Sequence, residues 1–279
     1  MDNRPIGFFD SGLGGLTCIP YLLRALPNER IVYFGDTART PYGSKAPATI
    51  KKFAAEITDF LVENQNAKMI AIACNTVSAV ALEDLRQRYS AIPILGIITP
   101  AARVIAKTCV PANKIGVIGT KATIASGVYP EKILSLNKGL SIFQQACPAL
   151  VPLIEEGIAD NDIMDLAIRY YLDNFLKENR IDTLVLGCTH YPLIRENIIR
   201  LYPSLRIVDP SEEILASLQD TLDSRDIAAE AQEPDHVFYA SDLSENFINM
   251  INLIFSGTGY PETFTNIDIE TFLDERSEE

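Results

Sequence analysis

Short apolar runs recur along the chain and alternate with longer segments whose apolar residues repeat at helical spacing. Runs of four or five apolar residues have the length of buried strands, and helix-length segments between them are typical of βαβ units. The pattern predicts an α/β fold with mainly parallel sheets and flanking helices. The expected strands are 6–9, 31–34, 69–73, 93–96, 114–118, 140–144, 183–186, 205–208 and 236–239, and the clearest expected helices are 47–63, 78–89 and 163–178.

An internal repeat divides the chain into two similar parts. IGFFDSG at 6–12 aligns with IGVIGTK at 115–121, and MIAIACNT at 69–76 aligns with LVLGCTH at 184–190. Positions 10 and 119 are 109 apart and positions 74 and 188 are 114 apart, so both matches have nearly one offset, as duplicated units should.

The repeat predicts two similar lobes related by a pseudo-twofold axis, with the active site in the cleft between them. We assign residues 1–98 to the first lobe and residues 99–209 to the second. Residues 210–279 are expected to carry one more strand and further helices, and to return to the first lobe.

Composition narrows the classes of partner. The chain has 279 residues and a formal charge of -13, without a cluster of Lys and Arg, so nucleic acid is not an expected partner. The acidic residues 269–279 are interpreted as a solvated tail. The apolar runs near Met69 and Ile92 are interrupted by polar residues or proline, and the first residues lack a signal-peptide pattern, so neither a membrane span nor secretion is expected.

The number and placement of the cysteines indicate a reducing compartment. There are five, an odd number, mostly within apolar segments, which disfavours a disulfide framework and favours the cytoplasm. Cys18, Cys109 and Cys147 are interpreted as small buried side chains of the core.

Four predicted strands end in turns that carry polar, small or reactive residues. In open parallel sheets, ligands bind beyond the carboxyl ends of the strands, where the following helices expose backbone N–H groups. The four turns are 10–12, 74–76, 119–123 and 188–190. We therefore expect these turns to face a common ligand site.

Two of these turns contribute a thiol, Cys74 and Cys188. Each stands at a predicted helix start, where the helix dipole should lower the pKa of the thiol. The pseudo-twofold relation would bring the two thiols together from opposite sides of the cleft. His190, two residues after Cys188, is a candidate proton partner for it, the alternative being a hydrogen-bonded core histidine.

Other kinds of site fit the sequence less well. The only histidines are His190 and His236, and there is no Cys-x-x-Cys, so a metal site is disfavoured. A redox cysteine pair would require thiols from separate lobes to approach to disulfide distance. GLGGL at 12–16 lacks the spacing of a nucleotide-binding loop, and its glycines are interpreted as allowing a tight turn close to an anionic ligand. PYG at 41–43 is either an ordinary turn or a loop that reaches the cleft.

The motifs together resemble those of the glutamate racemases, in the aspartate/glutamate racemase superfamily. The resemblance covers nearly the whole chain in the family's order and spacing. It is carried by FDSGLGGL, GDTARTPYGSK, ACNT, VIGT with the following KAT, CPALVPLIEEG and LGCTHYP. The FDSGxGG form of the first loop is similar to the glutamate branch rather than the aspartate branch.

The resemblance implies an enzyme that interconverts L- and D-glutamate without cofactor or metal and supplies D-glutamate for peptidoglycan. It implies that Cys74 and Cys188 are the acid/base thiols, with Asp10 as proton partner of the first and His190 of the second. It further implies substrate-binding positions at Asp10, Ser11, Tyr42, Gly43, Asn75, Thr76, Thr120, Thr123, Glu155, Thr189 and His190, with Glu155 near the histidine.

The chemistry is consistent with these residue types. Racemisation removes the α-proton from one face and returns a proton to the other, which one thiolate and one thiol can do, since the unperturbed pKa of cysteine is about 8.5. Hydroxyl and amide groups at helix starts can hold two carboxylates in a dry cleft. The alternatives that remain open are a racemase for aspartate or another amino acid and a dicarboxylate-binding protein without catalysis. The oligomeric state, including a homodimer, is also left open.

Overall fold

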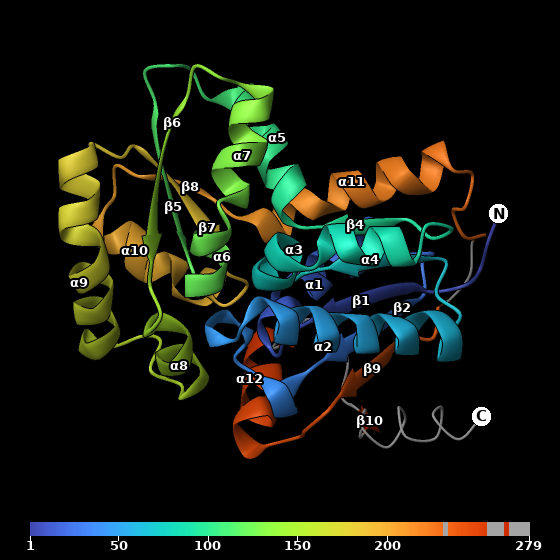
Figure 1. The fold of residues 1–279 in the computed structure, drawn as a ribbon. Coiled ribbons are helices and arrows are strands. Elements are labelled where there is room, and N and C mark those ends of the chain that lie inside the picture. The colour runs from blue at the N-terminus through green and yellow to red at the C-terminus, as the bar shows by residue number, and fades with distance from the viewer. Residues whose placement is uncertain (231–233, 256–264, 268–279) are drawn as a thin grey trace.

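The computed structural model describes residues 1–230, 234–255 and 265–267 (Figure 1). Their strands form two sheets in which every described pair is parallel. The tail at 269–279 lies outside the described residues. No helix among the described residues is both long and apolar enough to cross a membrane.

The two sheets have the same internal strand order. In the first sheet, β2 (Ile31–Gly35), β1 (Ile6–Asp10), β3 (Met69–Ile72) and β4 (Ile94–Gly96) are consecutive neighbours. In the second, the order is β6 (Ser141–Ala146), β5 (Lys114–Gly119), β7 (Thr183–Gly187) and β8 (Arg206–Val208). Each sheet thus follows the order second, first, third, fourth, which confirms the prediction of an α/β fold with two similar lobes.

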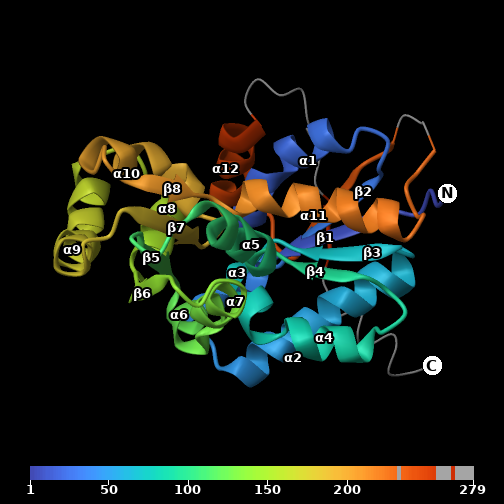
Figure 2. The same ribbon diagram turned by 90° about the horizontal axis from the view of Figure 1, so that it is seen from above.

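Helices cover both faces of each sheet, which explains why the strands are continuous apolar runs. Figure 2 shows the first sheet between α1, α11 and α12 on one side and α2, α3 and α4 on the other. Their bounds are α1 Ile19–Ala25, α2 Pro47–Asp59, α3 Asn75–Val80, α4 Leu82–Arg88, α11 Pro210–Ser224 and α12 Glu245–Phe255. The second sheet is flanked by α5 Ile98–Thr108, α6 Lys121–Ser126, α7 Val128–Leu136, α8 Leu150–Glu155, α9 Asp162–Asn179 and α10 Arg195–Leu201.

Most predicted elements agree with the structure to within one or two residues, and the main differences concern helices. The helix expected over 47–63 is α2, which ends at Asp59 and continues as a π-helical turn, Phe60–Asn64. The helix expected over 78–89 begins earlier, at Asn75, and is broken near Ala81 into α3 and α4. The apolar periodicity did not indicate that the helix starts at Asn75, because Asn75 and Thr76, the first two residues of α3, are polar.

The segment after 210 contributes two strands rather than the one expected. β9 (Val237–Ala240) pairs with β2, and β10 (Thr265–Asn266) pairs with β9 at the edge of the first sheet. Two residues are too short to give a periodic signal, so β10 was not predicted.

The lobes are packed together through one continuous core. Buried residues of both sheets, such as Ile6 of β1 and Ile115 of β5, belong to the same apolar cluster. This cluster also includes Ile105 of α5 and Leu218 of α11. α5 packs against both α7 and α11. The residue boundaries given above for the two domains stay a prediction.

Candidate active site

The turns after β1, β3 and β7 meet at one cavity between the sheets, together with Thr120 after β5. Parallel strands place their carboxyl ends at the same sheet edge, and here the two edges face each other. The cavity is lined by Ser11, Thr40, Pro41, Tyr42, Gly43, Cys74, Asn75, Thr76, Thr120, Val151, Cys188, Thr189 and His190. Both predicted thiols therefore open onto the same space, one from each lobe.

Cys74 is the N-cap residue of α3 and is 4% exposed. Its thiol donates a hydrogen bond to the Ser11 hydroxyl over 3.3 Å. Burial, together with the nearby charge of Asp10, raises the pKa of Cys74 to about 12, against the lowering effect of the Ser11 hydrogen bond. The expected lowering by the start of the helix is present as a hydrogen bond from the backbone N–H of Val77, but removal of the thiolate from water outweighs it, so the net pKa is raised.

Asp10, at the end of β1, is fully buried and lies behind the cavity rather than on its wall. The backbone N–H of Gly12 donates to its carboxylate over 3.1 Å, and the Thr189 hydroxyl donates to it over 3.3 Å. Burial raises the pKa of Asp10, and the charge of His190 and these hydrogen bonds counteract the rise. Asp10 makes no direct hydrogen bond to Cys74 in the described chain, so any exchange of a proton between them requires movement or an intermediary.

Cys188 follows β7, but it does not begin an α-helix. The next helical segment is a 3-10 turn, Tyr191–Ile194, which starts three residues later. The sequence-based expectation of a helix start at Cys188 is therefore wrong, because Thr189 and His190 turn away to face the first lobe.

His190 links Cys188 to a carboxylate. Its Nδ1 lies 3.8 Å from the Cys188 sulfur, and its Nε2 lies 3.0 Å from Glu155 Oε1. Burial by itself lowers the pKa of His190, but the hydrogen bonds and charges of Cys188 and Glu155 outweigh it and hold this pKa well above its ordinary value. His190 is thus kept protonated beside the Cys188 sulfur, an arrangement suited to proton exchange.

Three threonine hydroxyls form a cluster across the lobes. Thr76 lies 3.0 Å from Thr120 and 3.3 Å from Thr123, and the latter two are 3.0 Å apart. Thr120 also caps α6 by accepting the N–H of Thr123. Thr76 and Thr120 line the cavity, whereas Thr123 is fully buried behind them. The cluster can present hydroxyl donors to an anion while its members support one another.

Two glycines allow the lobes to touch. A Cβ at Gly14 would lie 2.2 Å from Thr189 Oγ1 and 2.7 Å from His190 Nδ1, and one at Gly43 would lie 2.4 Å from Thr120 Cβ. The glycines of the first loop were interpreted as making room for a ligand. At Gly14 the close neighbour is instead the facing turn of the second lobe.

Most of the predicted site residues line the cavity, and three support it from behind: Asp10, Thr123 and Glu155. Thr40, Pro41 and Val151 also line it and were not among the predicted positions. The sequence did contain a signal for these three positions, since they belong to the GDTARTPYGSK and CPALVPLIEEG motifs. Pro41 and Val151 were missed because they carry no acid/base or anion-binding group, whereas Thr40 carries a hydroxyl that the motif comparison did not single out.

The other cysteines are all free and buried. Cys18 and Cys109 pack in the core as predicted. Cys147 packs in the same core, also as predicted. It borders a small hollow that shares Pro41, Gly43, Thr120 and Val151 with the site cavity.

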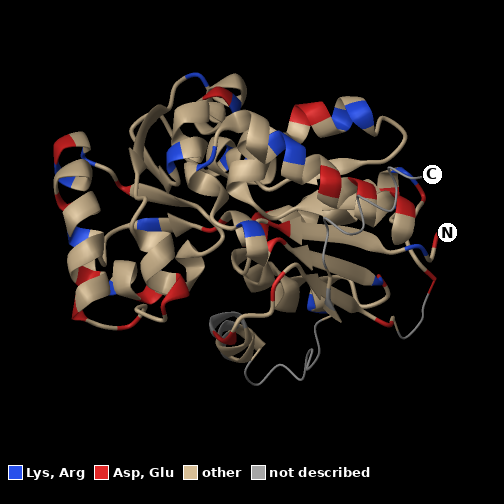
Figure 3. Cartoon of the chain, turned by 60° about the horizontal axis from the view of Figure 1, so that its bottom comes forward, with Lys and Arg blue, Asp and Glu red and all other residues tan. Residues whose placement is uncertain are grey.

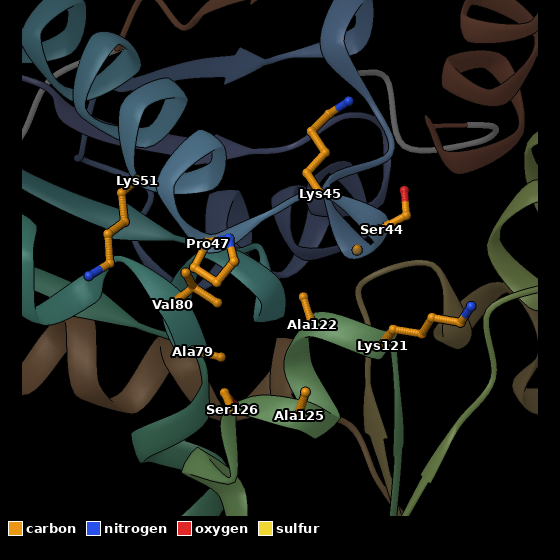
Figure 4. Close-up of a pocket in the computed structure, with 11 residues that line it drawn as sticks. Ser44, Lys45, Pro47, Lys51, Ala79, Val80, Lys121, Ala122, Ala125 and Ser126 are labelled. Carbon is orange, nitrogen blue, oxygen red and sulfur yellow. The ribbon is translucent and has the colours of Figure 1, made fainter.

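A more open hollow of about 550 Å³ lies beside the cavity between α2, α3 and α6. Figure 4 shows Lys45 and Lys51 of the first lobe and Lys121 of the second around it. It contains neither thiol of the site, and its floor consists of alanine, valine and proline side chains. Over the described chain, Lys and Arg are interspersed with Asp and Glu (Figure 3). No group of three or more His, Cys, Asp or Glu that could hold a metal ion is found among the described residues.

Two similar α/β lobes, each presenting a thiol to one cavity, define a class of enzyme that handles a small molecule from two sides. The chain belongs to the Asp/Glu/hydantoin racemase family, whose model matches residues 17–218. This confirms the resemblance found in the sequence motifs.

Relatives and solved structures agree with the family assignment. A glutamate racemase from Chlorobaculum tepidum is 44% identical over 264 residues, which cover 93% of this chain and 95% of the relative. One from a Sulfurihydrogenibium species is 48% identical over 216 residues, covering 77% and 82% respectively. The crystal structure of glutamate racemase from Francisella tularensis in complex with D-glutamate has a TM-score of 0.89 at 36% identity, covering 97% of this chain and 100% of that one.

Proposed function

We propose that this protein racemises glutamate, using Cys74 and Cys188 as acid and base on opposite faces of the α-carbon. The observation that carries the proposal is that the two thiols, from equivalent turns of the two lobes, line one cavity. The family membership and the glutamate racemases among its relatives support the same activity.

Each direction of the reaction uses the two sulfurs in turn. A thiolate takes the α-proton as the C–H bond breaks, the electron pair remains on the α-carbon, and the opposite thiol then donates its proton to that carbon. We assign abstraction from L-glutamate to Cys188 and abstraction from D-glutamate to Cys74. Because the pKa of Cys74 is raised to about 12, mainly by burial, Cys74 is a protonated thiol in the protein without substrate. This is the form that donates the proton in the conversion of L- to D-glutamate. In the reverse direction, the positive charge of the ammonium group of the bound substrate favours the thiolate form of Cys74.

Cys188 has a proton partner next to it, His190, whereas Asp10, the partner assigned to Cys74, is more distant. His190 can exchange a proton with Cys188 and is in turn oriented by Glu155. Asp10 acts on Cys74 mainly through its charge, and the Ser11 hydroxyl contacts that thiol directly. We assign Asp10 and His190 as proton partners on this basis.

The rest of the cavity provides hydrogen bonds for a substrate with two carboxylates. The candidate donors are Ser11, Asn75, Thr76, Thr120 and Thr189, and Tyr42 and Gly43 also line the cavity. In a cavity closed to water such donors stabilise charge that develops on the substrate, which is the contribution needed when no cofactor delocalises the carbanion. We propose that the reaction needs neither metal nor pyridoxal phosphate.

The discriminating experiment compares racemisation of L-glutamate and L-aspartate by the purified protein after exhaustive treatment with a chelator. Glutamate turnover, with aspartate turned over far more slowly, is expected. Faster turnover of aspartate would favour the alternative amino-acid racemase. Binding without turnover of either substrate would favour a dicarboxylate-binding protein, and activity that returns only with metal or pyridoxal phosphate would refute the cofactor-free mechanism.

We further propose that the product is D-glutamate for peptidoglycan synthesis and that the protein acts in the cytoplasm. D-Amino acids are components of bacterial cell walls, and the five buried cysteines are all free, as a thiol-dependent mechanism in a reducing compartment requires. Assembly as a homodimer is also proposed, and sedimentation of the purified protein would test it.

A further inference from the structure

A hydrogen bond between the lobes ends on an amide that lines the cavity. Tyr129, in the first turn of α7 in the second lobe, donates its hydroxyl hydrogen to Asn75 Oδ1 of the first lobe over 2.6 Å. Tyr129 is 0% exposed and Asn75 is 2% exposed, so water does not compete for this bond. The tyrosine itself does not line the cavity.

The other end of the same amide has no partner. Asn75 Nδ2 is buried and makes no hydrogen bond in the described chain. A buried N–H group without an acceptor is costly, and such groups in native structures call for an explanation. Asn75 stands between Cys74 and Thr76 on the cavity wall, so the simplest explanation is an acceptor that occupies the cavity.

The hydroxyl of Tyr129 determines which end of the amide is left for that acceptor. Asn75 Oδ1 can only accept, so the phenol must be the donor, and the Nδ2 group is then directed elsewhere. Burial raises the pKa of Tyr129 well above its ordinary value, so the phenol keeps the proton that it donates. With the amide turned over, Nδ2 would donate to the Tyr129 oxygen, and the hydroxyl hydrogen would lose the one acceptor that it has in the described chain. A carbonyl oxygen would then face the ligand.

We propose that Tyr129 is a positioning residue for substrate binding: it fixes the amide of Asn75 so that Nδ2 donates to a carboxylate of the substrate. The inference rests on the proposed function for the identity of the substrate. Because the two residues belong to different lobes, the amide is oriented only when the lobes are together. Tyr129 thereby couples assembly of the cleft to recognition of the carboxylate.

The test is a double-mutant cycle on steady-state racemisation of glutamate in both directions. Tyr129→Phe removes the hydroxyl and keeps the ring, so it should raise KM about threefold to tenfold, as expected for one oriented hydrogen bond, with a smaller change in kcat. Asn75→Ala removes the amide and should raise KM at least as much. In the Asn75→Ala background, Tyr129→Phe should have little further effect on KM.

Tyr202→Phe is the matched control. Tyr202 also donates a hydrogen bond of 2.6 Å, to Asp173 on the surface of the second lobe, and it lies outside the cavity. It should leave KM unchanged. Thermal unfolding of all variants separates the loss of packing from the loss of binding.

Three outcomes overturn the proposal. They are an unchanged KM in Tyr129→Phe, the same rise in KM with and without Asn75, and a change confined to kcat or thermal stability. Failure of the wild-type protein to turn over glutamate would instead refute the proposed function. Direct titration of Tyr129→Phe with D-glutamate, compared with wild type, would then still report on the orientation of the amide.

Discussion

The hydroxyl of Thr189 donates to the carboxylate of Asp10 over 3.3 Å, which ties the turn that carries Cys188 to the strand end beneath Cys74. The carboxylate proposed to serve one thiol is therefore hydrogen-bonded to the neighbour of the other. A change on one side of the cavity is expected to reach the other side through this contact.

Replacing either thiol should strongly reduce racemisation but leave one-sided proton abstraction. Cys74→Ser and Cys188→Ser should each lower racemisation by roughly 10²- to 10⁴-fold, since each lacks an acid or base for one face. A glutamate analogue with a leaving group on the β-carbon needs only abstraction, after which the carbanion expels that group. The Cys188 variant should eliminate from the D isomer alone and the Cys74 variant from the L isomer alone. Elimination from both isomers by either variant would exclude the two-base assignment.

Replacing the proton partners should impair the two directions unequally. Asp10→Asn should slow abstraction from D-glutamate most and His190→Asn abstraction from L-glutamate most, each by roughly tenfold to a hundredfold in kcat with less effect on KM. Solvent deuterium exchange into each enantiomer measures the two abstraction steps separately. Equal losses in both directions for both variants would contradict the pairing of Asp10 with Cys74 and of His190 with Cys188.

Removing the charge of Glu155 should shift the pH dependence of one direction. Its hydrogen bond and charge help to hold the pKa of His190 above the ordinary value, so Glu155→Gln lowers that pKa and His190 loses its proton at a lower pH. Formation of L-glutamate requires Cys188 to be supplied with a proton, so the alkaline limb of that rate should move to lower pH. Glu156→Gln, at an exposed neighbouring position, is the control and should not move it. An unchanged profile in Glu155→Gln would show that this carboxylate does not tune His190.

Adding one methyl group at Gly14 should separate the turns that meet there. A Cβ at this position would lie 2.2 Å from Thr189 Oγ1, so Gly14→Ala must displace the turn that carries Cys188. We expect a loss of about 1–3 kcal/mol in the free energy of unfolding and a fall in kcat/KM of at least tenfold. Gly139→Ala, whose nearest neighbour would be a proline carbon at 3.2 Å, is the control. If Gly14→Ala kept full activity and the wild-type resistance to unfolding by urea, the close contact between the Gly14 turn and the Thr189 turn would be contradicted.

The apolar pattern by itself determined the strands, their parallel pairing and the position of both thiols at strand ends. These features are local: a buried strand needs a run of apolar residues, and a parallel sheet collects the carboxyl ends of its strands at one edge. The repeat of that pattern also indicated two similar lobes. The motifs around Cys74 and Cys188 then led to the family.

The tertiary structure decided which groups contact each other across the lobes. The pKa of Cys74 follows from its burial beside Asp10, and that of His190 follows from hydrogen bonds to Cys188 and Glu155. The contact between Tyr129 and Asn75 joins residues 54 positions apart. None of these can be predicted from local spacing, because packing of the two lobes through α5 and α11 sets the distances, and the energies of buried polar groups depend on those distances.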